Sequence, residues 1–322
     1  MSQITQPPLP LFEVRLTAPD ISRWVAGNTG IAGFTTRASG KPGPHVAILG
    51  VGHGNEIAGA IVLDRLLRHG LTPARGKLTF GFTNIAAYER FDPQQPTASR
   101  FVDEDINRVW DPAVLDGQRS SIELDRAREI RPLIDTVDML FDLHSMLWPS
   151  DPLILCGTSP KGRRLAFGAA VPELVVADHG HAAGLRLIDY PRFADAATAC
   201  AASLLEAGQH WDDATVDTMF ASVAGLLRHL ETVTDHPALP PPTVSATQRF
   251  AEVTMAVTAA SNNFAFVQPY RGGDIIPRRN TLIALDGETE IRTPHDDCVL
   301  IMPSLRPSRG HTAVRLARFV AE

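Results

Sequence analysis

The residues best suited to chemistry gather in one glycine-rich segment, GVGHGNE at 50–56, between an apolar run and a helical pattern. His53 and Glu56 are three residues apart, so both side chains can reach one ion at the start of a helix. Imidazole nitrogen and carboxylate oxygen suit zinc, and two histidines with one carboxylate form a catalytic zinc pattern. The segment therefore predicts a metal site that needs a third ligand.

His144 is the predicted third ligand. It lies in the segment FDLHS, residues 141–145, at the C-terminal end of an apolar strand pattern, where open α/β sheets place their sites. Asp142 is two residues earlier and faces the same way on a strand, so its carboxylate can orient a metal-bound imidazole. The alternative is that this segment is only a polar exit from the strand.

Two further segments could supply catalytic groups. Glu206 ends the apolar run LLE at 204–206, and beside a zinc-bound water it would be a natural general base. A carboxylate that caps a turn or faces solvent is the alternative. The segment RFVDEDINR at 100–108 places Arg100 and Arg108 around three acidic residues. Guanidinium groups can clamp a carboxylate or stabilise an oxyanion, although a solvated loop with internal ion pairs is the simpler interpretation.

Other interpretations of these segments are weaker. A dinucleotide-binding loop would need glycine where Asn55 stands and an acidic residue after the next strand, which stops near Asn84. His210, three residues before Asp213, is interpreted as part of the N-terminal cap region of the next helix. No G-x-S-x-G motif occurs, which argues against a serine hydrolase.

The sequence pattern around these residues predicts an α/β fold, because apolar runs typical of strands alternate with segments of helical periodicity up to about residue 231. A mostly parallel sheet flanked by helices is expected. The predicted strands are 11–16, 31–36, 45–51, 77–83, 137–143, 152–156 and one that includes 203–205. The predicted helices are 56–69, a helix that a capping box at Ser120 and Glu123 opens and that ends near 135, and 213–231.

The chain changes character after a proline-rich segment at 234–246. Short apolar runs separated by turns follow it, at 250–257, 263–269, 281–287, 298–304 and 311–319. This pattern predicts a small β-rich domain. We therefore expect a catalytic domain at 1–240 and a smaller β-rich domain at 241–322.

Composition limits the class of protein. The 322 residues are 44% hydrophobic and 20% charged, an ordinary globular balance. The net charge of -6 argues against a nucleic-acid partner. No apolar run is long enough for a transmembrane helix, and the start MSQITQPPLP lacks the features of a secretory signal. Three scattered cysteines without a CxxC pair fit a reducing cytoplasm, so we expect a cytoplasmic protein without a membrane partner.

Four motifs together resemble a known family. HGNE, R-x7-R ending in DINR, DLHS and LLEAG occur in the order typical of the succinylglutamate desuccinylase/aspartoacylase family of the zinc carboxypeptidase superfamily. The resemblance covers most of residues 45–210. It implies a carboxypeptidase-like α/β domain, a smaller C-terminal domain beside the mouth of the site, and one Zn²⁺ per chain.

The resemblance also implies a role for each candidate residue. The zinc ligands would be His53, Glu56 and His144. Glu206 would be the general base and proton shuttle, and Arg100 would polarise the scissile carbonyl and stabilise the oxyanion. The remaining candidates would contact the substrate: Asn107 and Arg108 at its carboxylate, and Tyr270 through its hydroxyl. The implied reaction is hydrolysis of a small N-acyl amino acid or related amide by zinc-activated water.

The sequence departs from the family at one point. Aspartoacylase-like members carry an arginine about ten residues before the catalytic glutamate, which binds the side-chain carboxylate of the amino acid. Here that position falls in ADAA at 194–197, and the nearest arginine is Arg192, which weakens the case for N-acetylaspartate as substrate. The alternatives are a zinc carboxypeptidase that acts on peptide C-termini and a non-catalytic protein that binds a metabolite or nucleotide. A homo-oligomer is possible.

Overall fold

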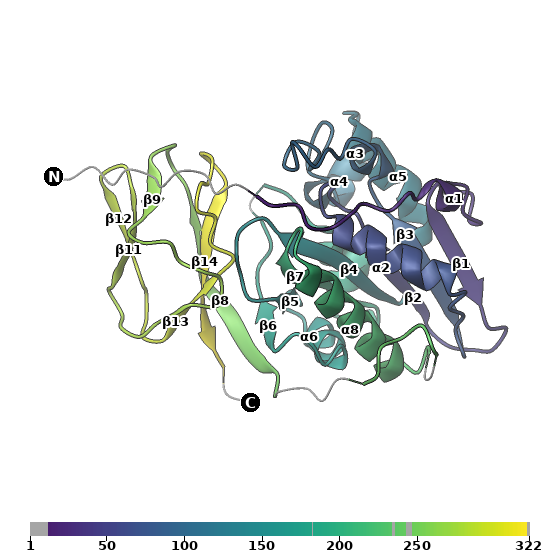
Figure 1. The fold of residues 1–322 in the computed structure, drawn as a ribbon. Helices are drawn as coiled ribbons and strands as arrows, with labels where there is room; N and C mark the ends of the chain where they lie inside the picture. Colours follow the sequence, from purple (N-terminus) through teal and green to yellow (C-terminus); the bar gives the residue numbers. More distant parts are fainter. Residues whose placement is uncertain (1–11, 182, 234–235, 243–246, 321–322) are drawn as a thin grey trace. The chain divides into compact units, whose positions relative to one another are not determined.

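The computed structural model describes residues 12–181, 183–233, 236–242 and 247–320 (Figure 1). The chain divides into two compact units. The larger unit contains Val14–Ser145 and Pro152–Gln248, and the smaller contains Met1–Glu13, Met146–Asp151 and Arg249–Glu322. The domain bounds 1–240 and 241–322 stay a prediction. Residues 234–235 and 243–246 of the expected boundary segment lie outside the described residues.

The larger unit is built on a mixed sheet, whose strands among the described residues follow the order β1-β3-β2-β4-β7-β5-β6. Strand β2 runs parallel to both β3 and β4, and β5 runs parallel to β6. Strand β1 is antiparallel to β3, and β5 is antiparallel to β7. The bounds are β1 (Phe34–Ala38), β2 (His45–Gly50), β3 (Lys77–Phe82), β4 (Met139–Met146), β5 (Leu153–Leu155), β6 (Leu174–Ala177) and β7 (Ala201–Gln209).

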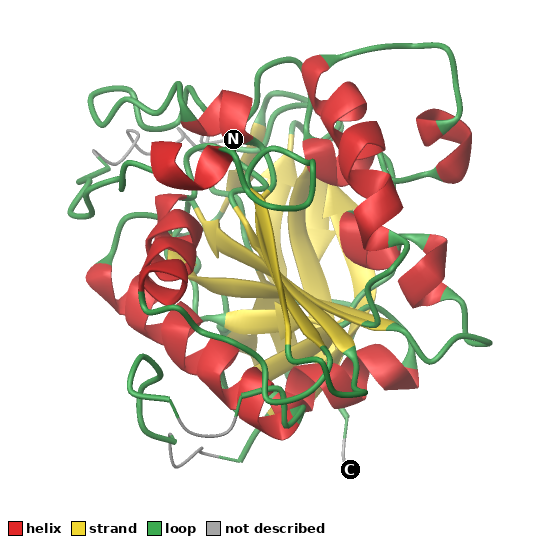
Figure 2. Cartoon of the chain, turned by 90° about the vertical axis from the view of Figure 1, so that its right-hand side faces the viewer, coloured by secondary structure: helices red, strands yellow, loops and turns green. Residues whose placement is uncertain are grey.

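Helices lie on both sides of the strands (Figure 2). Helix α2 packs against α8, and α8 packs against α6. The bounds are α1 (Ser22–Val25), α2 (Ile57–Arg68), α3 (Ile85–Tyr88), α4 (Pro112–Leu115), α5 (Ile122–Ile134), α6 (Pro160–Gly168), α7 (Pro191–Ala194) and α8 (Asp213–His229), with 3-10 turns η1 (Ile106–Arg108) and η2 (Leu187–Asp189). The predicted α/β class is therefore confirmed. None of the helices in the described ranges is long and apolar enough to cross a membrane.

The parallel pairing of β2 and β4 positions the candidate site. All six residues of β2 are buried, as its apolar run predicts. In the register between the two strands, Gly50 at the end of β2 faces Leu143. Because parallel strands end at the same edge of a sheet, the glycine-rich segment after β2 and His144 on β4 meet there.

The expected N-terminal pair of strands is wrong in part. Residue 11 lies outside the described residues, and residues 12–16 form no strand. The strand expected at 31–36 begins only at Phe34, because Ile31 and Gly33 belong to a turn in which the Phe34 amide donates to the Ile31 carbonyl at 3.1 Å. Gly33 has a φ of +74°, a conformation that glycine adopts without strain and that does not continue a strand.

The predicted capping box at the start of α5 is also wrong. Ser121, not Ser120, caps the helix, since its hydroxyl accepts a hydrogen bond from the Leu124 amide at 3.0 Å. Glu123 does not reach back to the cap residue. Its buried carboxylate instead accepts hydrogen bonds from the backbone of the loop at 102–104. The sequence pattern therefore located the helix but assigned Glu123 the wrong partner.

The smaller unit is β-rich, as predicted. One set of antiparallel strands has the order β8-β14-β13-β10, and a three-stranded antiparallel sheet has the order β12-β11-β9. Tyr270 lies in the apolar core of this unit, where its ring packs at 5.8 Å from that of Phe266. The bounds are β8 (Arg249–Thr258), β9 (Phe264–Phe266), β10 (Ile275–Ile276), β11 (Leu282–Asp286), β12 (Thr289–Arg292), β13 (Cys298–Ile301) and β14 (Thr312–Phe319).

Candidate metal centre

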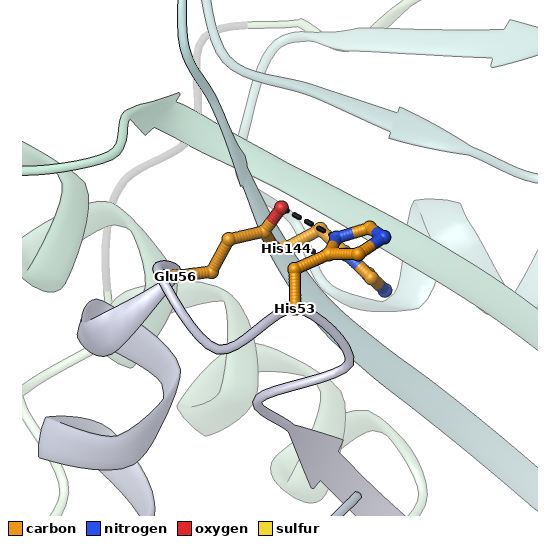
Figure 3. A group of neighbouring side chains, drawn as sticks. All are labelled: His53, Glu56 and His144. Carbon is orange, nitrogen blue, oxygen red and sulfur yellow. Dashed lines mark hydrogen bonds and ion pairs between the residues drawn. The ribbon is translucent and has the colours of Figure 1, made fainter. Parts of the chain in front are cut away.

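Three buried side chains that the sequence analysis singled out lie together: His53, Glu56 and His144 (Figure 3). Their potential ligand atoms all lie within 4.8 Å of one another. The Glu56 carboxylate lies between the two rings, with Oε1 at 2.7 Å from His53 Nδ1 and Oε2 at 2.9 Å from His144 Nδ1. In the part of the chain that the structure describes, no other three His, Cys, Asp or Glu side chains come this close.

The glycines around His53 are required by close packing. A Cβ at Gly52 would lie 2.8 Å from Cε1 of the His144 ring, and one at Gly54 would lie 2.3 Å from the backbone of Ala87. Just before them, Val51 has a φ of 61°, which is strained for a β-branched residue. The glycine-rich segment thus brings the backbone close to the imidazoles, which accounts for its glycines without a bound dinucleotide.

The distal nitrogen of each histidine faces a carboxylate. His144 Nε2 lies 2.9 Å from Asp142 Oδ2, and His53 Nε2 lies 3.0 Å from Asp105 Oδ1. A carboxylate on one ring nitrogen fixes the tautomer and orients the other nitrogen toward a metal. The two Nδ1 atoms are therefore the ligand atoms of this arrangement. The sequence analysis proposed Asp142 for this role but did not assign it to Asp105.

The electrostatics of the group suit a cation. Burial alone would raise the pKa of Glu56, but the charges of His53 and His144 hold it well below its usual range. Burial alone would lower the pKa of His144, but Asp142 and Glu56 raise it well above its usual value. The sheet edge therefore concentrates negative charge around two imidazoles. Two ring nitrogens with one ionised carboxylate are the donor set of a catalytic zinc site, so the residues present fit this metal.

Arg100 lies at the edge of the metal group. Its Nη2 is 3.1 Å from Asp105 Oδ2, and its Nη1 is 3.7 Å from Glu56 Oε1. The side chain keeps 39% of its surface exposed, unlike the ligands. Burial acts to lower the pKa of Arg100, but the charges of Asp105, Glu56 and Glu206 raise it. The guanidinium is charged, as arginine always is at neutral pH, and the charge of Glu206 is among those that stabilise it.

Asn107 and Arg108 follow Asp105 in the same loop. The Asn107 side chain donates from Nδ2 to Asp142 Oδ2 at 3.3 Å and accepts from the Leu187 amide at 2.8 Å. Arg108 Nη1 donates to the Asn107 carbonyl at 2.6 Å, and its Nη2 lies 3.6 Å from Asp105 Oδ2. Asn107 thus holds the loop against β4, while Arg108 places its guanidinium beside Asp105.

Glu206 is carried by β7, the neighbour of β4 in the sheet. It is 7% exposed and stands opposite Leu153 of β5. The charge of Glu206 contributes to the raised pKa of Arg100, so Glu206 lies near the guanidinium at the edge of the metal group. Tyr270 belongs to the smaller unit, and its role at the site stays a prediction.

His210 is a buried residue near the centre that sequence reasoning missed. It does not cap α8, since the cap residue is Asp212, whose side chain accepts from the Ala214 amide at 3.3 Å. Instead, His210 Nδ1 lies 2.8 Å from the Ser145 hydroxyl, next to His144. Burial lowers the pKa of His210 to about 3, so the ring is neutral. The available signal was its place four residues after Glu206, just beyond the end of the strand.

Comparisons with known proteins point to one family. A sequence model of the succinylglutamate desuccinylase/aspartoacylase catalytic domain matches residues 42–220. Aspartoacylase from Mus musculus is 33% identical over 123 residues, which are 35% of this chain and 37% of that protein. The match to such curated relatives thus spans little more than a third of their length.

Solved structures share the fold. A succinylglutamate desuccinylase/aspartoacylase from Rhodobacter sphaeroides is 17% identical with a TM-score of 0.63, and the match covers 90% of this chain and 89% of that one. Succinylglutamate desuccinylase from Chromobacterium violaceum is 16% identical with a TM-score of 0.64, covering 91% and 90%. The family match alone spans more than half of the chain and includes the three residues of the metal group. The chain therefore belongs to the succinylglutamate desuccinylase/aspartoacylase family.

Proposed function

We propose that the protein is a zinc-dependent amidohydrolase that removes the acyl group from a small N-acyl amino acid or a related amide. The observation that carries this proposal is the buried group of His53, Glu56 and His144, whose ligand atoms lie within 4.8 Å of one another. Membership in a family named for desuccinylase and aspartoacylase activities supports the reaction class.

The proposed ion would be held by the Nδ1 atoms of His53 and His144 and by the Glu56 carboxylate. A bound zinc ion acts as a Lewis acid and makes a coordinated water more acidic. Asp105 and Asp142 would hold the two imidazoles in the required tautomer, since each lies within 3.0 Å of a distal ring nitrogen.

The remaining steps belong to protein side chains. Glu206 takes a proton from the attacking water and gives it to the leaving amine nitrogen as the carbon–nitrogen bond breaks. Arg100 donates hydrogen bonds to the carbonyl oxygen as it gains negative charge, which lowers the barrier to attack. Arg100 is charged for this role, as arginine is at any physiological pH, and its carboxylate neighbours raise its pKa further.

The carboxylate of the substrate would bind at Arg108, with Asn107 holding the loop in place. For a second carboxylate, the arginine nearest in sequence to the position that aspartoacylase-like members use is Arg192. Arg192 donates to the Val137 carbonyl at 2.6 Å, just before β4 begins, whereas His144 lies near the other end of that strand. We therefore propose an amine half with a single carboxylate.

Arg186 does not replace the missing arginine. Its guanidinium is buried and binds both oxygens of Asp178, at 2.7 and 2.9 Å. Nε of the same guanidinium donates a hydrogen bond to Asp189 Oδ2 at 2.7 Å. Because both carboxylates belong to the protein, Arg186 stabilises the turn that contains it and is engaged before any substrate arrives.

The test is amine release by zinc-loaded protein from a panel of N-acyl amino acids and short peptides. We expect turnover of N-acyl monocarboxylic amino acids in preference to N-acyl aspartate or glutamate. In Glu206→Gln, we expect kcat to fall by roughly 10²–10⁴-fold, the range typical of general acid–base groups, with zinc content unchanged because Glu206 is not a ligand.

Other outcomes would redirect the proposal. Release of C-terminal residues from peptides would identify a carboxypeptidase with the same metal chemistry. A preference for N-acyl aspartate would contradict the single-carboxylate assignment. Zinc-replete protein that turns over no member of the panel would rule out the substrate class.

A further inference from the structure

Two adjacent residues after β7 contact both segments that carry the proposed metal ligands. His210 Nδ1 lies 2.8 Å from the Ser145 hydroxyl. Trp211 Nε1 donates to the Asn55 carbonyl at 3.1 Å. Both side chains are almost fully buried, and their rings lie 5.3 Å apart. The pair therefore joins the turn after β7 to strand β4 and to the glycine-rich segment through buried hydrogen bonds.

The residues contacted are the immediate neighbours of ligands. Ser145 follows His144, and its backbone amide donates to Glu56 Oε2 at 3.2 Å. Asn55 precedes Glu56 in the glycine-rich segment. A shift of the Trp211 contact would thus move the backbone before Glu56 directly, and a shift of the His210 contact would act on the backbone after His144 through the Ser145 side chain.

The pair is also tied to the proposed base. His210 follows the last residue of β7, the strand that carries Glu206 four residues earlier. Glu206 and the ligands come from different strands, so their relative position depends on contacts across the sheet edge. A misplacement of about 1 Å between reacting groups can cost 10²-fold in rate.

We propose that His210 and Trp211 are positioning residues that hold the strand of Glu206 in register with the segments of His53, Glu56 and His144. The inference rests on the proposed metal centre. Neither residue touches substrate in this scheme. His210 fixes the backbone after His144, and Trp211 fixes the backbone before Glu56.

A matched comparison exists in the same sheet. His45 is also buried, and its Nε2 lies 2.7 Å from the Thr79 hydroxyl. It starts β2, at the opposite end of the strand from the glycine-rich segment. His45 therefore resembles His210 in being buried and hydrogen-bonded to a hydroxyl, but its neighbours differ, and its Nδ1 also lies 3.1 Å from the Thr136 carbonyl. Its replacement reports the cost of losing a buried histidine without a change at the metal centre.

The experiment measures zinc affinity by competition with a chromophoric chelator, together with kcat and KM on the best substrate of the panel. His210→Leu should weaken zinc binding by about 10–100-fold, the range seen when a residue behind a ligand is lost. It should also lower kcat more than it raises KM. His210→Asn, whose amide can replace the Nδ1 contact, should recover most of both. His45→Leu should lower the melting temperature and leave zinc affinity within about twofold.

Trp211→Phe keeps an aromatic side chain and removes the indole N–H that binds Asn55, together with one ring of the indole, so it tests the proposal even if His210→Leu does not fold. We expect weaker zinc binding and a lower kcat. If Trp211→Phe matches wild type and a folded His210→Leu does so too, or if His45→Leu loses as much zinc affinity as His210→Leu, the positioning role is wrong. If the wild-type protein itself binds no zinc, the proposed function fails first, and the two failures are distinguishable.

Discussion

At the residue scale, the metal group is a chain of alternating imidazoles and carboxylates. Asp105, His53, Glu56, His144 and Asp142 follow one another at 2.7–3.0 Å. Each imidazole thus lies between two carboxylates, one shared and one its own. Removing an outer carboxylate would leave the ligand in place but free its ring to turn.

Asp105→Asn tests this arrangement. Burial would raise the pKa of Asp105, but His53, Arg100 and Arg108 hold it well below its usual range, so the native side chain is an anion. The neutral amide is a weaker acceptor for His53, and we expect zinc affinity to fall by about 10–100-fold. Chelator competition measures the change. Asp111→Asn, at the cap of α4, is the control, since asparagine also caps helices. Equal zinc affinity in the two variants would contradict the role of Asp105.

His45 gives a prediction for the dependence of stability on pH. Burial is the largest influence on His45 and lowers its pKa below 6.5. The unfolded chain therefore takes up this proton before the folded protein does as pH falls below about 6.5. The contribution of His45 to the free energy of unfolding is complete above about pH 6.5. It decreases as pH falls from there toward the pKa of His45 in the folded protein, by at most about 1.4 kcal/mol per pH unit.

Urea unfolding of the metal-free protein at several pH values measures this slope. The range from pH 7.5 to pH 5.5 extends about one unit on either side of the unperturbed histidine pKa. His45→Asn should reduce it, whatever constant offset the lost contact to Thr79 adds. Parallel pH curves for the two proteins would show that His45 does not contribute to the acid sensitivity of the fold.

At the scale of elements, the loop with Arg100 and Arg108 is held by one side chain of α5. The buried Glu123 carboxylate accepts from the backbone amides of Val102, Asp103 and Glu104 at 2.6–3.2 Å. The Asn84 side chain donates to it at 3.1 Å. Helix α5 therefore fixes the loop that presents the proposed substrate contacts.

Glu123→Gln should loosen this loop. One acceptor oxygen becomes a donor that faces backbone amides, and leaving a buried donor unsatisfied costs about 1–3 kcal/mol. We expect that loss in the free energy of unfolding, and a KM for the N-acyl substrate that rises more than kcat falls. Glu129→Gln on the same helix is the control, since this exposed residue forms a surface pair with Arg126. A wild-type KM in Glu123→Gln would mean that the contacts of Glu123 to the loop do not contribute to substrate binding.

These elements also show what sequence can predict. His53, Glu56 and His144 were identifiable because the ends of adjacent parallel strands meet at one sheet edge, so short local motifs converge there. The partners of Asp105, Glu123 and Trp211 were not identifiable. Their contacts join positions from about 20 to more than 150 residues apart, and no local spacing encodes them. Glu123 even fits a capping box that the helix does not use.

At the scale of the whole molecule, the proposed ligands all belong to the larger of the two units. A ligand that binds only the folded state stabilises it by mass action, by about 2.7 kcal/mol at one hundred times its dissociation constant. Hydrogen exchange reports such stabilisation segment by segment. Zinc should therefore slow exchange in β2, β4 and the loop at 100–108.

The smaller unit provides the internal comparison. Strands β8, β13 and β14 contain no proposed ligand and have a core of their own. We expect their exchange to stay within about twofold of the metal-free rate, which is small beside the roughly hundredfold slowing that 2.7 kcal/mol produces. Chelation should reverse the protection in the larger unit. Equal protection of both units would mean that they open in one cooperative step, and the metal would then stabilise the molecule as a single body rather than the unit that binds it.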